Sequence, residues 1–265
     1  MTAATRPHTV TPSTSPTWIA PLAFAIFQIL TPTLPLLGIG EQIGSQSDSA
    51  RTLITPAGWA FSIWGALYAG SLVFAVYQAL PAHRDNRLFD QVRLPAAGAF
   101  AGNAVWALYT QMFGLSAISV VIISFTLVCL LTAYRRFAAW PQPFTAGERW
   151  CAGLPLTALA SWLTVATTVN IAASLRFHGV EGGSATPMIS AAMLIVAGLI
   201  GASALLKGRG CPPYALVFLW ALSAIYAAGG QQASTVALAA LVSAVLIVGA
   251  TVIGLSRGGA RHWFG

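Results

Sequence analysis

Three stretches of the sequence carry tryptophan together with amide or hydroxyl side chains at helical spacing. The first, TPAGWAFSIWGALY at residues 55–68, holds four aromatic residues, the second is the N-x-x-W pair at 103–106, and the third places Trp, Ala and Asn at 162, 166 and 170. Residues three or four apart share one face of a helix. Flat aromatic walls with a few polar groups are what a bulky apolar ligand requires, so the three stretches predict a shared binding pocket.

Two structural roles compete with ligand binding for these residues. Tryptophan and tyrosine gather at the membrane surface in an aromatic belt, which accounts well for several tryptophans outside the three stretches. Those are Trp18, Trp140, Trp150 and Trp263. A belt accounts less well for Tyr68, which lies roughly 13 Å along the helix axis from Trp59 at about 1.5 Å per residue. Buried amides also join helices by hydrogen bonds, and this role stays open for each asparagine taken alone.

The residues needed for chemistry inside a membrane are missing from these stretches. All 6 acidic residues and all 4 histidines fall in predicted loops or tails, so the predicted spans carry no ionisable side chain at membrane depth. A proton-coupled pump, a retinal protein, a membrane metalloenzyme and a bis-histidine haem protein each need such groups in the core. We therefore predict no catalytic residue and no metal ligand, although the loop acids Glu41 and Asp48 could close over a pocket.

Membrane-spanning helices must position the aromatic and amide residues. Of the 265 residues, 57% are hydrophobic and 7% charged, whereas soluble proteins average about 25% charged residues. A span needs about 20 apolar residues, and the two longest charge-free stretches each hold two spans separated by a glycine-containing break. The predicted fold is an all-α integral membrane protein, an eight-helix transmembrane bundle. Its helices are expected near residues 18–38, 57–80, 95–113, 117–137, 151–174, 187–206, 212–229 and 233–256.

The basic residues set the expected orientation of this bundle. With eight spans, every Lys and Arg except Arg51 and Arg176 lies at one membrane face, which the positive-inside rule assigns to the cytoplasm. We therefore expect a multi-pass protein of a bacterial-type plasma membrane with both termini cytoplasmic. The net charge of +7 follows from this topology and does not imply a nucleic-acid partner. Residues 1–17, rich in Thr, Pro and Ser, are predicted to be a disordered cytoplasmic tail, with a cleaved signal peptide as the alternative.

The aromatic motifs resemble those of the tryptophan-rich sensory protein family, also called TspO/MBR or translocator proteins. The family's second span carries a motif that begins P-P-G-W and continues with Phe, Trp, Leu and Tyr, to which PAGWAFSIWGALY at 56–68 is similar. The third span carries N-x-x-W and the fifth W-x-x-x-A-T-x-x-N, matched at 103–106 and 162–170. The chain departs from the family at Ala57, at Ser62 and Ile63, and in lacking a Pro-Tyr pair before Trp162.

This resemblance covers residues 18–175 and implies a division of the chain. Residues 18–175 would form a TspO/MBR-like five-helix unit, 176–256 a three-helix C-terminal extension, and 257–265 a cytoplasmic C-terminal tail. Family members bind porphyrins, haem, sterols and related hydrophobic molecules in a pocket between the helices, capped here by residues 41–55. No cofactor is required, porphyrin or haem is implied as a ligand, and a homodimer is a further expectation. The implied ligand-binding residues are Trp59, Phe61, Trp64, Tyr68, Asn103, Trp106, Trp162, Ala166 and Asn170.

Three functions remain open on the sequence. The first is a membrane-embedded sensor or translocator that binds a flat hydrophobic ligand such as a porphyrin, haem or a sterol-like molecule. The second is a secondary transporter of a small hydrophobic substrate, which eight spans and proline-interrupted helices favour but which lacks a coupling residue. The third is a membrane enzyme that acts on lipid, terpene or porphyrin through loop acids such as Glu41 and Asp48. The predicted partners are this small hydrophobic ligand and the lipid bilayer.

Overall fold

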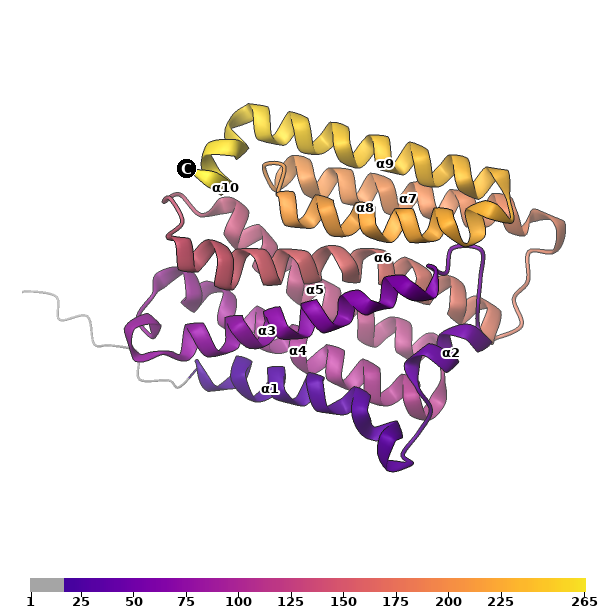
Figure 1. The fold of residues 1–265 in the computed structure, drawn as a ribbon, viewed down its shortest axis with the longest axis horizontal. Coiled ribbons are helices and arrows are strands. Elements are labelled where there is room, and N and C mark those ends of the chain that lie inside the picture. Colours follow the sequence, from indigo (N-terminus) through magenta and orange to yellow (C-terminus); the bar gives the residue numbers. More distant parts are fainter. Residues whose placement is uncertain (1–16) are drawn as a thin grey trace, which may run out of the picture.

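The long helices lie side by side, so the chain runs back and forth between two ends of a bundle (Figure 1). The computed structural model describes residues 17–265, and the predicted tail at 1–17 falls outside them except for Thr17. The predicted all-α class is confirmed for the described residues. The long helices are α1 (Ile19–Leu30), α3 (Ile63–Ala79), α4 (Arg87–Phe113), α5 (Ala117–Ala139), α6 (Leu154–Phe177), α7 (Thr186–Lys207), α8 (Pro212–Ala227) and α9 (Ser234–Gly254).

Short helical segments lengthen the long helices or connect them. The 3-10 segment η1 (Thr31–Leu37) continues α1, because Pro32 and Pro35 lack the N–H groups that an α-helix needs. A second 3-10 segment, η2 (Gly58–Ser62), precedes α3, and a π-helical turn, η4 (Glu148–Gly153), leads into α6. The loop between η1 and η2 contains one short helix, α2 (Ile43–Ser49). The α-helical part of the first span thus ends at Leu30, before the predicted boundary near residue 38.

Seven helical segments of the described chain are long and apolar enough to cross a membrane. They contain α1, α3, α5, α6, α7, α8 and α9 with their flanking segments, and they make the chain a multi-pass integral membrane protein. The predicted count of eight spans is not confirmed, because α4 does not meet the same criterion. Its membrane-depth half carries buried Asn103 and Gln111, and α4 packs against both α1 and α5. A helix enclosed by its neighbours needs less apolar surface than one that faces lipid.

The start of α4 corrects the prediction for Arg93. The sequence placed Arg93 in a loop before a helix at 95–113, but α4 begins at Arg87, because the Asn86 side chain accepts hydrogen bonds from the first free backbone N–H groups. Arg93 is therefore helical and only 2% exposed. Its guanidinium donates to Gln78 Oε1 at 2.8 Å and to the carbonyl oxygen of His83 at 2.9 Å. These bonds tie α3 to α4.

The chain reversals divide between two ends that we call the basic end and the far end (Figure 1). The basic end contains residues 80–87, 139–149, 207–212 and 255–265, and the far end contains residues 38–57, 113–117, 177–186 and 228–234. Arg51 and Arg176 lie at the far end. All the other Lys and Arg residues of the described chain lie toward the basic end, so the helix arrangement keeps the charge segregation that the sequence predicts.

Helices α7, α8 and α9 form a layer along one side of α6 (Figure 1). The opposite side of α6 packs against α3 and α5, which makes α6 the most enclosed helix of the bundle. Its contact with α8 is polar as well as apolar. Ser161 Oγ donates to the carbonyl oxygen of Tyr214 at 2.6 Å, and the Thr164 and Tyr214 hydroxyl groups lie 2.9 Å apart. These bonds fix the α7–α9 layer on the helix that carries the third aromatic stretch.

The segment predicted as a C-terminal tail folds back onto the basic end. A π-helical turn, η7 (Leu255–Gly259), leads into α10 (Ala260–Phe264), and the Trp263 ring stacks on Phe144 with centroids 5.6 Å apart. The indole N–H of Trp263 donates to the carbonyl oxygen of Gly208 at 3.1 Å. Because Trp263 is 5% exposed, its role is packing, and the aromatic-belt interpretation was wrong for this residue.

Candidate functional site

A small cavity lies where the three aromatic stretches meet, in the half of the bundle nearer the far end. We call it the aromatic pocket, and its volume is about 60 Å³. Its walls come from η2 and α3, from α4 and from α6, and α2 contributes to its cover. The lining residues are Ile43, Ser47, Thr55, Pro56, Phe61, Trp64, Trp106, Leu115, Trp162, Val165, Ala166, Val169, Asn170 and Ala173.

Four aromatic rings from three chain segments form the walls of the aromatic pocket. The Trp64 ring lies nearly parallel to Trp106, with centroids 6.4 Å apart, and edge-on to Trp162 at 6.0 Å. The Phe61 ring meets Trp162 edge-on at 6.2 Å. Offset stacked and edge-to-face pairs at these distances are favourable for aromatic rings. The structure thus brings together Phe61, Trp64, Trp106 and Trp162, as the sequence predicts.

The α6 wall is a continuous stripe along one helical face. Trp162, Ala166 and Asn170 recur every four residues, and all three line the pocket, as the sequence predicts. Three further residues of the same face also line it. They are Val165, Val169 and Ala173. The sequence interpretation did not include them, although their positions three residues after Trp162, Ala166 and Asn170 follow the same helical period.

Three buried N–H groups on residues of the pocket lining have no hydrogen-bond partner. Asn170 Oδ1 accepts from Ser119 Oγ at 3.1 Å, whereas Asn170 Nδ2 has no partner. The indole Nε1 groups of Trp106 and Trp162 are also buried and without a partner. A buried donor left unpaired costs about 1–3 kcal/mol. The pocket would therefore be stabilised by a molecule that brings acceptor oxygens to these N–H groups.

Two predicted residues on the η2–α3 segment lie outside the pocket lining. Trp59 is 48% exposed and packs edge-on against Trp220 of α8, with centroids 4.8 Å apart. Tyr68 lies one turn along α3 from Trp64, with ring centroids 5.2 Å apart. Trp59 therefore contributes to the contact with the α7–α9 layer, and the Tyr68 ring packs against the Trp64 ring.

Asn103 also lies outside the lining, on the side of α4 that faces α1. Its side-chain amide donates to Gln28 Oε1 at 3.2 Å. Asn103 is 1% exposed and Gln28 is fully buried, so this bond joins two helices inside the membrane. For Asn103 the structure shows the interhelical role that competed with ligand binding.

The cover of the pocket is a loop whose short helix is not buried, whereas Ala50, Ile54 and Thr55 after it are buried. Ile43 and Ser47 of α2, together with Thr55, belong to the loop at 41–55 that the family resemblance predicts as a cap. No residue of α2 is buried. One backbone bond anchors the start of this loop, from Glu41 N–H to the carbonyl oxygen of Gln111 at 2.9 Å. Ligand pockets usually measure about 300–1,000 Å³, so a volume of about 60 Å³ is too small for a ligand of the usual size.

Groups for metal binding or acid-base chemistry do not gather at the pocket. Within residues 17–265, no three His, Cys, Asp or Glu side chains lie close enough together to hold a metal ion. The loop acids Glu41 and Asp48 are both exposed, and neither lines the aromatic pocket. The arrangement of rings and N–H donors is therefore suited to binding.

The comparison with protein families gives a match over most of the chain. The sequence model of the family described as TSPO-like protein matches residues 14–253. This range includes the helices that carry the aromatic motifs and also α7, α8 and α9 up to residue 253. No curated protein and no solved structure matches the chain significantly.

Proposed function

The chain belongs to the TSPO-like protein family, and from this membership we propose that it binds a flat hydrophobic ligand, such as a porphyrin, haem or a sterol-like molecule, in the aromatic pocket. One observation carries the proposal. Rings from three chain segments surround a common space, and three residues of its lining carry buried N–H donors without a partner. Ring stacking would hold the body of the ligand, and the donors would orient its carbonyl or carboxylate oxygens.

Binding of such a ligand requires the pocket to open. A tetrapyrrole does not fit a space of about 60 Å³, so the cover must move away from the rings. Segment α2 is suited to this movement, because it has no buried residue to withdraw from a core. The rings on α3, α4 and α6 belong to long packed helices and would stay in place.

Packing toward the basic end favours binding over passage across the membrane. Phe74, Phe89 and Phe100 are fully buried there, and the Phe74 ring lies 6.3 Å from both of the others. A transported molecule would have to separate these rings, whereas a bound one needs only the cover to open. The third function, a membrane enzyme, has no support from Glu41 or Asp48, since neither lines the pocket.

The proposed setting is a bacterial-type plasma membrane with the basic end in the cytoplasm. This orientation follows from the positive-inside rule, because 10 of the 12 Lys and Arg residues of the described chain lie toward that end. The aromatic pocket would then lie closer to the outer face, with its cover directed away from the cytoplasm.

Titration of the protein in lipid nanodiscs with protoporphyrin IX tests the proposal. The ligand should quench tryptophan fluorescence saturably, because it would lie beside Trp64, Trp106 and Trp162. Trp162→Phe removes one indole N–H and part of the wall, and should weaken binding about tenfold. Trp150→Phe changes an exposed tryptophan at the basic end and should leave the affinity unchanged. Absence of saturable quenching, or equal affinity in both variants, would contradict the proposal.

A further inference from the structure

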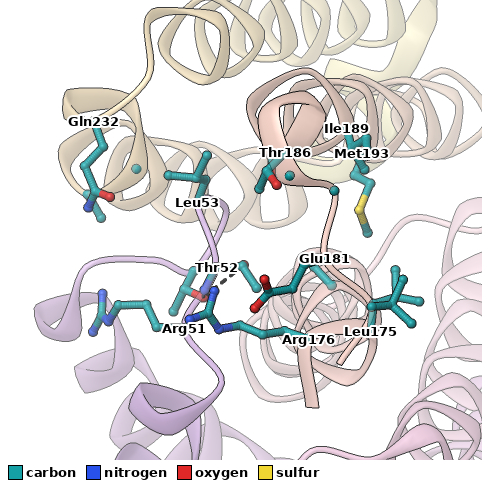
Figure 2. A pocket seen from close by; sticks show the side chains of 18 residues that line it. Arg51, Thr52, Leu53, Leu175, Arg176, Glu181, Thr186, Ile189, Met193 and Gln232 are labelled. Atoms are coloured by element: carbon teal, nitrogen blue, oxygen red, sulfur yellow. Dashed lines mark hydrogen bonds between the residues drawn. The ribbon is translucent and has the colours of Figure 1, made fainter. Parts of the chain in front are cut away.

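A second and larger cavity lies at the far end of the bundle (Figure 2). We call it the far-end cavity. It is enclosed by the end of α6, the start of α7, the turn between α8 and α9, and loop residues 51–55. Its volume is about 480 Å³, which lies within the range of about 300–1,000 Å³ that is usual for ligand pockets. The far-end cavity can therefore admit a small molecule without any rearrangement.

Two charged side chains face this cavity without an ionic partner. Residues 17–265 form two ion pairs, of which one joins Arg51 to Asp48 and the other lies at the basic end. Arg176 and Glu181 take part in neither, although both line the far-end cavity. Figure 2 shows Arg176 and Glu181 turned toward the loop at Thr52, whereas Arg51 points the other way. Arg176 thus offers a free guanidinium to a molecule in the cavity.

The charge of the lining favours an anion. Arg51 and Arg176 are its basic residues and Glu181 is its one acidic residue. Helix α7, which is 22 residues long, also begins at this wall, and no side chain caps its first N–H groups. The positive end of a helix dipole adds to the attraction for negative charge. Arg176 remains the principal group, because its guanidinium can donate two parallel hydrogen bonds to one carboxylate or sulfonate.

The uncharged part of the lining is mixed, with the polar residues Thr52, Thr55, Thr186, Ser190 and Gln232 beside apolar side chains. Leu175 follows Ala172 along α6, and Ile189 and Met193 lie one turn apart on α7. Leu53 closes the opposite side from the loop. A ligand that satisfies both parts of the lining has one anionic group and an apolar body.

We propose that the far-end cavity is a second binding site, for an amphipathic organic anion. The anionic group binds Arg176, and the apolar body packs against Ile189 and Met193 of α7. This site is independent of the aromatic pocket, because Thr55 is the one residue that lines both spaces. The α7–α9 layer, which supplies part of the lining, thereby takes part in ligand binding.

A matched pair of fluorescent probes tests this site. 8-Anilinonaphthalene-1-sulfonate and N-phenyl-1-naphthylamine share one apolar body and differ by the sulfonate. We expect the sulfonate to bind the protein in nanodiscs saturably, about tenfold more tightly than the neutral probe, after subtraction of the signal from empty nanodiscs. Arg176→Gln should remove this preference. Arg135→Gln, an equal charge change on the exposed basic end, should retain it.

Two further variants test whether the sulfonate probe binds in the far-end cavity. Met193→Trp narrows the far-end cavity beside α7 and should weaken binding of both probes, whereas Trp162→Phe in the aromatic pocket should leave the sulfonate affinity unchanged. This second result separates the far-end site from the porphyrin proposal, which Trp162→Phe tests by itself. A sulfonate preference that survives Arg176→Gln, or binding that Trp162→Phe weakens and Met193→Trp does not, would overturn the assignment.

Discussion

The aromatic pocket and the far-end cavity adjoin each other but are built in opposite ways. The aromatic pocket measures about 60 Å³ and is lined by four aromatic rings, whereas the far-end cavity measures about 480 Å³ and has three charged residues in its lining. They share Thr55, and the neighbouring residues Ala172 and Ala173 of α6 line one space each. The partition between them is therefore thin, consisting of α6 and the loop around Thr55.

This difference indicates that the two spaces select ligands by different means. In the proposed aromatic site the apolar surface of the ligand has to compensate for the displaced cover, so selection would depend on shape and buried area. In the larger far-end cavity the Arg176 guanidinium would select by charge. One chain can thus hold two unlike molecules on the two sides of a single partition.

Filling the aromatic pocket should have the largest effect on this pair of sites. Ala166→Trp adds an indole to a lining position of a pocket that has about 60 Å³ to spare. Protoporphyrin binding should fall by about 100-fold or more, because the ligand and the new side chain need the same space. Binding of 8-anilinonaphthalene-1-sulfonate should change by less than about twofold. Parallel titrations of one protein preparation check both values.

The control for added bulk is Val128→Trp on α5. Val128 is 62% exposed and lines neither space, so the affinity for both ligands should stay unchanged. Overpacking costs about 1–3 kcal/mol, and the thermal unfolding midpoint in detergent shows whether Ala166→Trp stays folded. A folded Ala166→Trp variant that loses both ligands equally would show that the two spaces act as one site.

The aromatic pocket could be predicted from the sequence because helical periodicity determines its walls. Trp64, Trp106 and Trp162 each belong to a long helix, so their faces follow from spacing alone. The same reasoning failed for Trp59, whose partner Trp220 lies on a helix much later in the chain. Contact between segments so distant in sequence depends on packing, which no local pattern encodes.

The far-end cavity could not be predicted for a related reason. Its walls combine helical faces at the ends of α6 and α7 with loop residues near Thr52 and the turn at Gly229, and no periodicity in the sequence places these loops against the helices. The sequence distinguishes Arg51 and Arg176 only as the two basic residues at the membrane face opposite to all other Lys and Arg residues. Their common position at one cavity depends on how the α7–α9 layer docks on α6.

A substitution that displaces the loop between the two spaces should weaken ligand binding at both, by less than Ala166→Trp weakens protoporphyrin binding. Gly229 lines the far-end cavity, and a Cβ atom there would overlap the backbone carbonyl of Leu53 in the partition loop. Gly229→Ala should displace that loop, lower stability by about 1–3 kcal/mol and weaken both ligands about fivefold. Gly249→Ala is the control, since a Cβ there meets no atom within 4 Å. Unchanged binding of both ligands by Gly229→Ala would show that the loop is not the partition.

The two sites should differ in whether ligand binding moves α2 in the cover. Because a space of about 60 Å³ does not hold a tetrapyrrole, protoporphyrin should displace α2 and speed amide hydrogen exchange severalfold across Ile43–Ser49. The sulfonate probe should leave exchange in Ile43–Ser49 unchanged, since its cavity of about 480 Å³ already has room for it. Helix α5 serves as the internal reference in both measurements. Equal exchange in Ile43–Ser49 with and without protoporphyrin would mean that the ligand enters without moving the cover.

Arg51→Gln should have the smallest effect and defines how the far-end cavity recognises charge. Arg51 lines the cavity, but its guanidinium already pairs with Asp48, and the two side chains are 42% and 64% exposed. An exposed pair of this kind contributes about 0–1 kcal/mol, so Arg51→Gln should weaken 8-anilinonaphthalene-1-sulfonate by about twofold or less. Arg176→Gln makes the same change in charge and should cost about tenfold. Equal losses in the two variants would show that the anion lies between both arginines, and that Arg176 is not its principal partner.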